Sequence, residues 1–148
     1  MMNKIQIESY ILVAVQFLCA VFFFYFVLST PLSLLSIILI TVADTDALWS
    51  IFTMHFGNFR LQPIPKDEAK LIMTGPYRFI RHPMYGAVLL GMLGIAISMD
   101  TWLGYAVWAV LFTDLYIKLR FEEKLLLEKF SEYAEYMKRT KKLLPFLW

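Results

Sequence analysis

The feature that most constrains this chain is the absence of any charged residue between Glu8 and Asp44. The stretch is predominantly apolar, and the polar sequence STP at Ser29–Pro31 divides it into two parts. An apolar helix needs about 20 residues to cross a bilayer, so each part is long enough for one crossing. The stretch therefore predicts two consecutive membrane spans, at residues 9–28 and 32–52.

Two further apolar segments follow, at residues 84–98 and 102–118, and the short polar sequence MDT at Met99–Thr101 joins them. Both are expected to cross the membrane, which gives about four transmembrane helices in all. Pro31 is expected to begin the second span, because the first turn of a helix tolerates the missing N–H of proline.

Three acidic residues lie within the expected spans, where an ionisable group is costly and suggests function. Asp114 has Lys118 four residues further on, so a salt bridge along one helix face is a sufficient explanation. Asp44 and Asp46 have no such local partner. They mark either an early exit of the second span toward water or a contact with a substrate, and the sequence leaves both interpretations open.

The composition agrees with a membrane protein. The 148 residues are 59% hydrophobic with a mean hydropathy of +0.61, which is unlike a soluble domain of this length. The single cysteine, Cys19, excludes a disulfide within the chain and does not favour a zinc site, so no metal is expected. A net charge of only +2 does not indicate a nucleic-acid partner. We expect one all-α integral membrane domain over residues 1–148.

The positions of the basic residues predict the orientation in the membrane. All 14 Lys and Arg residues precede the first span, lie between the second and third spans, or occur from the end of the fourth span onward. The loops at Ser29–Pro31 and Met99–Thr101 contain none. Because basic loops stay in the cytoplasm, both termini and any site beside the basic segments are expected on the cytoplasmic face.

Two segments outside the spans are expected to build a functional site. The connection Gly57–Arg81 contains three prolines, so it is not expected to form a continuous helix, and loops of this length are usually functional. After residue 118 the apolar and charged residues alternate at helical spacing. The fourth span is therefore expected to continue out of the membrane and then to bend onto the bilayer surface or back over the loop.

A group of polar residues precedes the third span, at Arg78, Arg81, His82 and Tyr85. Pro83 predicts that the helix begins there. Free N–H groups in its first turn, together with the helix dipole and Arg81, would favour a carboxylate or phosphate. Alternatively, the two arginines anchor the span to anionic lipid head groups. The residues alone leave both interpretations open.

The adjacent carboxylates Glu122 and Glu123 follow the fourth span. They either pair with nearby cations on a solvated helix face or bind the ammonium or hydroxyl groups of a ligand. The cations within reach along the helix are Lys118, Arg120 and Lys124.

The sequences LIMTGPYRFIRHPMYGAVLL and EEKLLLEKFSEYAEYMKRTKKLLPF, separated by one apolar hairpin, resemble a superfamily of membrane methyltransferases. Its members include the isoprenylcysteine carboxyl methyltransferases and the phospholipid N-methyltransferases. The resemblance covers about Phe59 to Phe146, and residues 9–28 carry no signal of it. The positions that match the pattern of the superfamily are Gly75, Tyr77, Arg81, His82, Pro83, Tyr85, Glu122, Glu123, Tyr133, Tyr136 and Pro145.

The resemblance implies S-adenosylmethionine as methyl donor, bound at the cytoplasmic face. Its carboxylate is expected at the helix start around His82, and its ammonium and ribose at Glu122. Its adenine is expected beside the loop around Leu71 and Ile72, near Tyr77. The full set of implied cofactor-binding residues is Gln62, Leu71, Ile72, Gly75, Tyr77, Arg81, His82, Pro83, Met84, Tyr85, Glu122 and Glu123.

The implied reaction is methyl transfer to a lipophilic acceptor at the membrane–cytosol boundary, most like isoprenylcysteine carboxyl methylation. Lys118 and Arg120 are the implied catalytic residues near the acceptor. That branch often has an arginine where this chain has Lys118, which weakens the transfer of its acceptor specificity. Phospholipid amines and small thiols stay open as acceptors, and a nicotinamide-dependent membrane reductase or a non-catalytic lipid-binding protein are the remaining alternatives. The expected partners are the acceptor and membrane lipids, and no oligomeric state is predicted.

Overall fold

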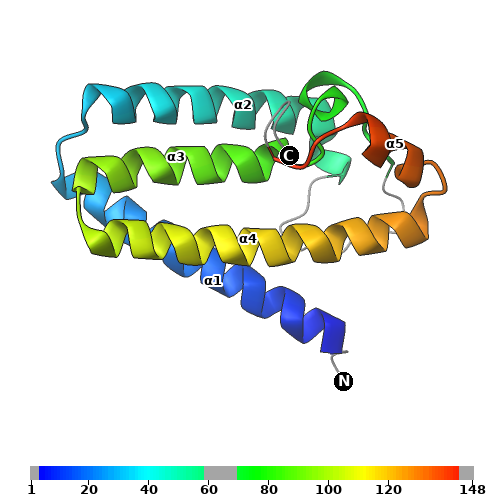
Figure 1. The fold of residues 1–148 in the computed structure, drawn as a ribbon, viewed down its shortest axis with the longest axis horizontal. Helices are drawn as coiled ribbons and strands as arrows, with labels where there is room; N and C mark the ends of the chain where they lie inside the picture. Colours follow the sequence, from blue (N-terminus) through cyan, green and yellow to red (C-terminus); the bar gives the residue numbers. More distant parts are fainter. Residues whose placement is uncertain (1–3, 59–69, 144–148) are drawn as a thin grey trace.

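The computed structural model describes residues 4–58 and 70–143, and helices dominate these parts of the chain (Figure 1). No strand is formed within them, in agreement with the predicted all-α fold. The elements in chain order are α1 (Lys4–Ser29), α2 (Leu34–Asn58), the short 3₁₀ helix η1 (Gly75–Arg78), α3 (Pro83–Met99), α4 (Trp102–Lys129) and α5 (Tyr133–Arg139).

Helices α1, α2 and α4 are long and apolar enough to cross a membrane, and α3 is a shorter apolar helix of 17 residues. On the outer faces of α1 and α2 large apolar side chains are exposed, among them Leu18 (71%) and Leu28 (74%). In water such faces would be unfavourable, whereas lipid solvates them. The chain is therefore an all-α integral membrane protein.

The four segments predicted as spans correspond to helices α1 to α4, but several helix ends differ from the predicted bounds. The expectation that Pro31 begins the second helix is wrong, because α2 starts at Leu34. Ser33 caps that helix: its hydroxyl accepts a hydrogen bond from Ser36 N at 3.2 Å. Helix α4 continues to Lys129, in agreement with the prediction that the fourth helix extends beyond residue 118.

Asp44 and Asp46 do not interrupt helix α2. Both lie within the continuous helix α2, where Asp44 is exposed and Asp46 is half-buried. An early end of the helix at these residues is therefore excluded, and α2 extends past the predicted residue 52 to Asn58.

Helices α2 and α3 approach each other closely because small residues line their contact. A Cβ atom on Gly94 would lie 3.1 Å from the carbonyl oxygen of Ser36, and one on Gly91 would lie 3.4 Å from Ala43 Cβ. Small residues allow two membrane helices to pack backbone against backbone. The Ser98 hydroxyl donates to Ser36 Oγ at 2.7 Å and accepts from Ser33 N at 2.8 Å, which joins the two helices at this end.

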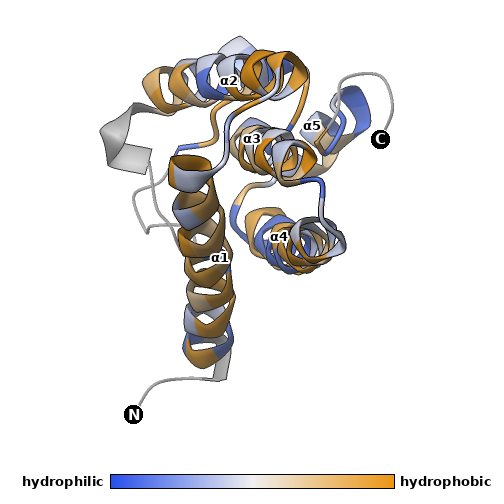
Figure 2. Ribbon diagram, turned by 90° about the vertical axis from the view of Figure 1, so that its left-hand side faces the viewer, coloured by the Kyte–Doolittle hydropathy of each residue, from blue (hydrophilic) through white to orange (hydrophobic). Residues whose placement is uncertain are grey.

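Helix α3 lies between α2 and α4, and α1 crosses α4 at an angle (Figures 1 and 2). As a result, the N-terminal end of α1, the start of α3, the end of α4 and α5 lie toward the same end of the molecule (Figure 1). The polar motifs that the sequence separates by an apolar hairpin therefore meet at one end of the bundle.

The segment that follows α5 returns over the loop before α3. Ile80 and Lys141 form a parallel bridge, in which Arg81 N donates to Lys141 O at 2.8 Å and Lys141 N donates to Phe79 O at 3.0 Å. Of the two courses predicted for the C-terminal segment, the return over the loop is the one that the structure contains.

Candidate functional site

His82 lies between the two adjacent carboxylates at the end of α4. Its Nδ1 is 3.8 Å from Glu122 Oε2, and its Nε2 is 3.6 Å from Glu123 Oε1. The imidazole ring is buried, and Nε2 has no hydrogen-bond partner among the residues that the structure describes. The cluster thus contains a buried polar atom whose hydrogen-bonding capacity is unused, which is rare unless a ligand or water completes it.

Tyr85 connects this histidine to the membrane side of the cluster. Its ring stacks on His82 with centroids 5.4 Å apart and planes 5° from parallel. Its hydroxyl donates to Glu122 Oε2 at 2.7 Å. One turn of α3 thereby fixes both a carboxylate of α4 and the imidazole at the helix start. About a quarter of the Glu122 side chain (27%) is exposed, so this carboxylate is still accessible to a ligand.

Arg81 is buried, with 8% of its surface exposed, and its guanidinium is already paired. Nε donates to Glu123 Oε1 at 2.6 Å, and Nη1 donates to the carbonyl oxygens of Met137 and Thr140. A guanidinium held in this way is not available to lipid head groups, whereas Arg78 is exposed. The geometry supports a positioning role for Arg81, which joins the loop to α4 and to the end of α5.

The start of α3 is covered in this structure. The N–H groups of Arg81 and His82 donate to the carbonyl oxygens of Lys141 and Lys142, and the Tyr85 N–H donates to His82 O. Pro83 is fully buried and has no N–H group. The expected open row of N–H groups for an anion is therefore largely satisfied by the protein itself, and the accessible polar atoms of the cluster belong to side chains.

Lys118 extends the cluster toward α1. The side chain is 1% exposed, and Nζ lies 5.3 Å from the centre of the Tyr85 ring, in cation–π range. The same Nζ donates to Gln16 Oε1 at 2.7 Å. The predicted salt bridge with Asp114 is not formed. Lys118 turns instead to α1, and sequence reasoning missed Gln16 because a single polar residue in an apolar span has no local pattern.

Three buried tyrosines surround the cluster on the side of the loop and α5. The Tyr136 hydroxyl donates to Tyr77 O at 2.6 Å, and burial raises the pKa of Tyr136 to about 12. Burial also raises the pKa of Tyr77 and of Tyr133 well above the ordinary value, and the charges of nearby glutamates add to this. All three therefore stay protonated at neutral pH. Tyr133 Oη is buried without a hydrogen-bond partner in the described parts of the chain.

Gly75 is required where the loop contacts α2. Its φ is +57°, a conformation that favours glycine, and a Cβ atom there would lie 2.5 Å from Thr53 Oγ1. The matched glycine therefore serves backbone geometry and close packing, which places the following Tyr77 in the buried interior.

The remaining predicted residues differ in how far they are buried. Leu71, Ile72 and Met84 are half-buried, and Arg120 is exposed on a different face of α4 from Lys118. The structure therefore does not bring Arg120 into the cluster. Gln62 and Pro145 lie outside the described residues.

A metal site is not formed by the residues that the structure describes. Within them, no three His, Cys, Asp or Glu side chains lie close enough together to hold a metal ion.

The fold and this cluster define an integral membrane protein with a buried polar cluster toward one end of its helices. The chain belongs to the phospholipid methyltransferase family, because the model of that family matches residues 25–133, more than half of the chain. The match includes His82, Tyr85 and both carboxylates, whereas Gln16 lies before it.

Two curated proteins are similar to the chain. The cobalt-zinc-cadmium resistance protein CzcN of Cupriavidus metallidurans is 38% identical over 78 residues, which cover 52% of this chain and 36% of that protein. The nickel-cobalt-cadmium resistance protein NccN of Alcaligenes xylosoxydans xylosoxydans is 28% identical over 109 residues, which cover 73% of this chain and 47% of that protein. The chain thus spans less than half the length of either relative.

Proposed function

We propose that the protein transfers a methyl group from S-adenosylmethionine to a lipophilic acceptor at the membrane–cytosol boundary. The observation that carries this proposal is the cluster of His82, Tyr85, Glu122 and Glu123 inside the region that matches the family. These residues come from the start of α3 and from the C-terminal half of α4, which lie toward the same end of the bundle (Figure 1).

The residues present fit the chemistry of this donor. Glu122 is a partly exposed carboxylate, suited to an ammonium group or to ribose hydroxyls. His82 Nε2 and Tyr133 Oη are buried polar atoms without partners in the described chain, and each could complete its hydrogen bonding with a ligand. Leu71 and Ile72, both half-buried, are suited to an adenine ring.

Arg81 and Glu123 position the groups that would contact the donor. The ion pair between them, at 2.6 Å, holds the loop against α4, and the backbone carbonyls of α5 complete the coordination of the guanidinium. Their role is to fix His82 and Glu122 in place. Lys118, on the membrane side of the Tyr85 ring, is the group best placed to orient an anionic or hydrogen-bonding acceptor.

S-adenosylmethionine, held by the residues named above, would supply an activated methyl group on its sulfonium sulfur. The protein then contributes mainly alignment of the two reactants and exclusion of water. The stacked His82 and Tyr85 rings and the buried tyrosines are suited to both tasks, because they form a rigid and largely water-free wall.

The chemical class of the methyl acceptor is a separate question within this proposal. Isoprenylcysteine carboxyl methylation was expected from the sequence, and the family match equally supports a phospholipid amine. The metal-resistance names of the two relatives describe those proteins, and the described residues of this chain offer no metal site that would favour direct metal binding. A nicotinamide-dependent reductase has no support from the family match.

Calorimetric titration of the detergent-purified protein with S-adenosylhomocysteine tests the donor site. We expect saturable binding by the wild type, and a loss of affinity of about tenfold or more for Glu122→Gln and His82→Ala, because each removes a charge-assisted or buried contact. Glu128→Gln is the matched control, since Glu128 is exposed on the same helix. Absence of binding by folded wild-type protein, or equal affinity in all variants, would refute the proposed donor site.

A further inference from the structure

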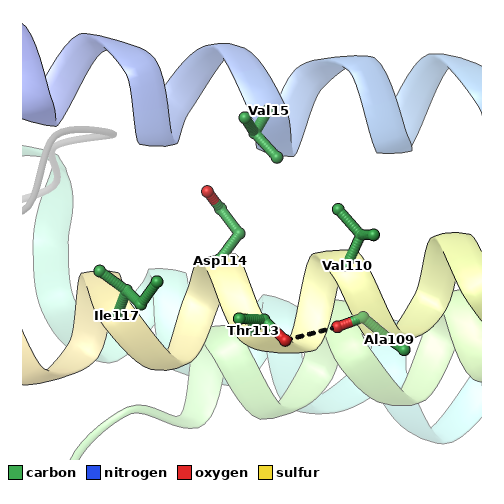
Figure 3. Close-up of a pocket in the computed structure, with 6 residues that line it drawn as sticks. All are labelled: Val15, Ala109, Val110, Thr113, Asp114 and Ile117. Atoms are coloured by element: carbon green, nitrogen blue, oxygen red, sulfur yellow. Dashed lines mark hydrogen bonds between the residues drawn. The ribbon is translucent and has the colours of Figure 1, made fainter.

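A groove of about 410 Å³ lies between α1 and α4, on the membrane side of the cluster. Four of its six lining residues are apolar, and the hydroxyl of Thr113 is already bonded within α4, where it donates to Ala109 O at 2.9 Å (Figure 3). The residues that line it are Val15, Ala109, Val110, Thr113, Asp114 and Ile117.

Asp114 is the polar group of this groove that its own helix does not satisfy. It is 5% exposed, its Oδ2 has no hydrogen-bond partner among the described residues, and Figure 3 shows the side chain directed across the gap toward α1. The nearest cation along the helix, Lys118, donates to Gln16 instead. In either protonation state the carboxyl group of Asp114 keeps an acceptor oxygen, and a buried acceptor without a donor is unfavourable.

The groove lies next to the candidate site along both helices. Val15 lines the groove, and the next residue of α1, Gln16, holds Lys118. Lys118 in turn lies over the Tyr85 ring, whose hydroxyl contacts Glu122. A molecule in the groove would therefore lie along membrane helices, next to the residues that connect α1 and α4 to the polar cluster.

We propose that this groove binds the methyl acceptor, and that the acceptor is a long-chain lipophile carrying an N–H or O–H group that donates to Asp114. The apolar lining accommodates the chain, and Asp114, which is four residues or about 6 Å along α4 from Lys118, accepts from the donor group. The proposal rests on the proposed function only in naming the ligand as the methyl acceptor. The groove and its unpartnered carboxyl group are independent of it.

Photolabelling in bilayer discs of phosphatidylcholine tests this inference, because that lipid has no N–H or O–H donor in its head group. The probes are three hexadecyl chains with a mid-chain diazirine that end in a primary amine, an alcohol or a methyl ether. We expect saturable labelling of the peptides containing Val15 and Ile117 by the amine, the alcohol or both, and at least about tenfold less by the ether.

Three variants complete the experiment. Asp114→Leu removes the acceptor at similar volume and is expected to reduce labelling by the donor probes to the level of the ether. Val110→Trp fills the groove without changing Asp114 and is expected to reduce labelling by every probe, so it tests the site if Asp114→Leu does not fold. Thr41→Val, which lies on α2 outside the groove and whose hydroxyl is already bonded to Ile37 O within that helix, is the control and is expected to label normally.

Equal labelling by the ether, or unchanged labelling of Asp114→Leu and Val110→Trp, would overturn the inference. S-adenosylhomocysteine titration of the same variants separates the two proposals. Normal titration with failed labelling refutes the groove alone, and failed titration of wild-type protein with specific labelling refutes the proposed methyl donor.

Discussion

Arg81 joins three segments of the chain that are far apart in sequence. Its guanidinium contacts Glu123 of α4 and the carbonyl oxygens of Met137 and Thr140 at the end of α5, while its backbone N–H pairs with Lys141. A buried charge is stable only when it is paired and fully hydrogen-bonded, and here every contact comes from the protein. At the residue scale, the rigidity of the candidate site depends on this side chain.

Replacing Arg81 by Ala is expected to lower the free energy of unfolding by about 3 to 5 kcal/mol, because Glu123 would lose its buried partner. The measurement is reversible unfolding of the purified protein in mixed micelles. Arg78→Ala is the matched control, since Arg78 is exposed in the same loop, and it should change stability by no more than about 0.5 kcal/mol. Equal effects of the two substitutions would contradict the structural role of Arg81.

The residue scale also shows what the sequence could predict. The positions of His82, Tyr85, Glu122 and Glu123 follow from a recognisable motif, and the structure places them together. The motif does not say which of them faces a ligand, and it does not distinguish Arg81, which is internally paired, from Glu122, which is partly exposed. Gln16 could not be predicted, because its partner Lys118 is 102 residues away and no periodicity links them.

At the scale of elements, the C-terminal segment after α5 closes the start of α3. The bridge between Ile80 and Lys141 uses backbone groups, so it depends on chain direction and not on side-chain identity. The spans themselves were predictable, because a long apolar segment without charges rarely forms anything other than a membrane-spanning helix. The docking side of the short helix α5 was not predictable, because the bilayer surface and the loop before α3 both offer an apolar face.

Lys141→Pro is expected to open this bridge, because proline cannot donate the hydrogen bond that Lys141 N makes to Phe79 O. S-adenosylhomocysteine affinity should fall by about tenfold, the cost of one misplaced hydrogen-bonding group. Lys141→Ala keeps the backbone donor and removes only an exposed side chain, so it should bind normally. Calorimetry on both variants decides the matter, and unchanged affinity of the proline variant would show that the bridge does not support the site.

At the scale of the whole molecule, the four helices bring both described ends of the chain to the same end of the bundle (Figure 1). The two loops at the opposite end, Ser29–Pro31 and Met99–Thr101, carry no basic residue. The positive-inside rule then predicts that this end faces the cytoplasm. The candidate site would open where the lipid phase and the cytosolic donor meet.

Cysteine labelling in sealed right-side-out vesicles tests this orientation. The starting protein is Cys19→Ala, because Cys19 is the only cysteine. A cysteine at the exposed residue Trp102 is expected to react with an impermeant maleimide added outside, and a cysteine at exposed Ser131 only after the vesicles are opened. The reverse pattern would place the cluster outside the cell and contradict a cytosolic methyl donor.

The most direct test of the central claim is methyl transfer itself. Purified protein in bilayer discs containing total membrane lipid is incubated with methyl-tritiated S-adenosylmethionine, and the tritium that enters the organic phase is counted. We predict time-dependent incorporation by the wild type that falls at least about a hundredfold in the double variant His82→Ala and Glu122→Gln, because two contacts to the donor are removed. No incorporation above background by folded wild-type protein, or equal incorporation by the double variant, would contradict the account.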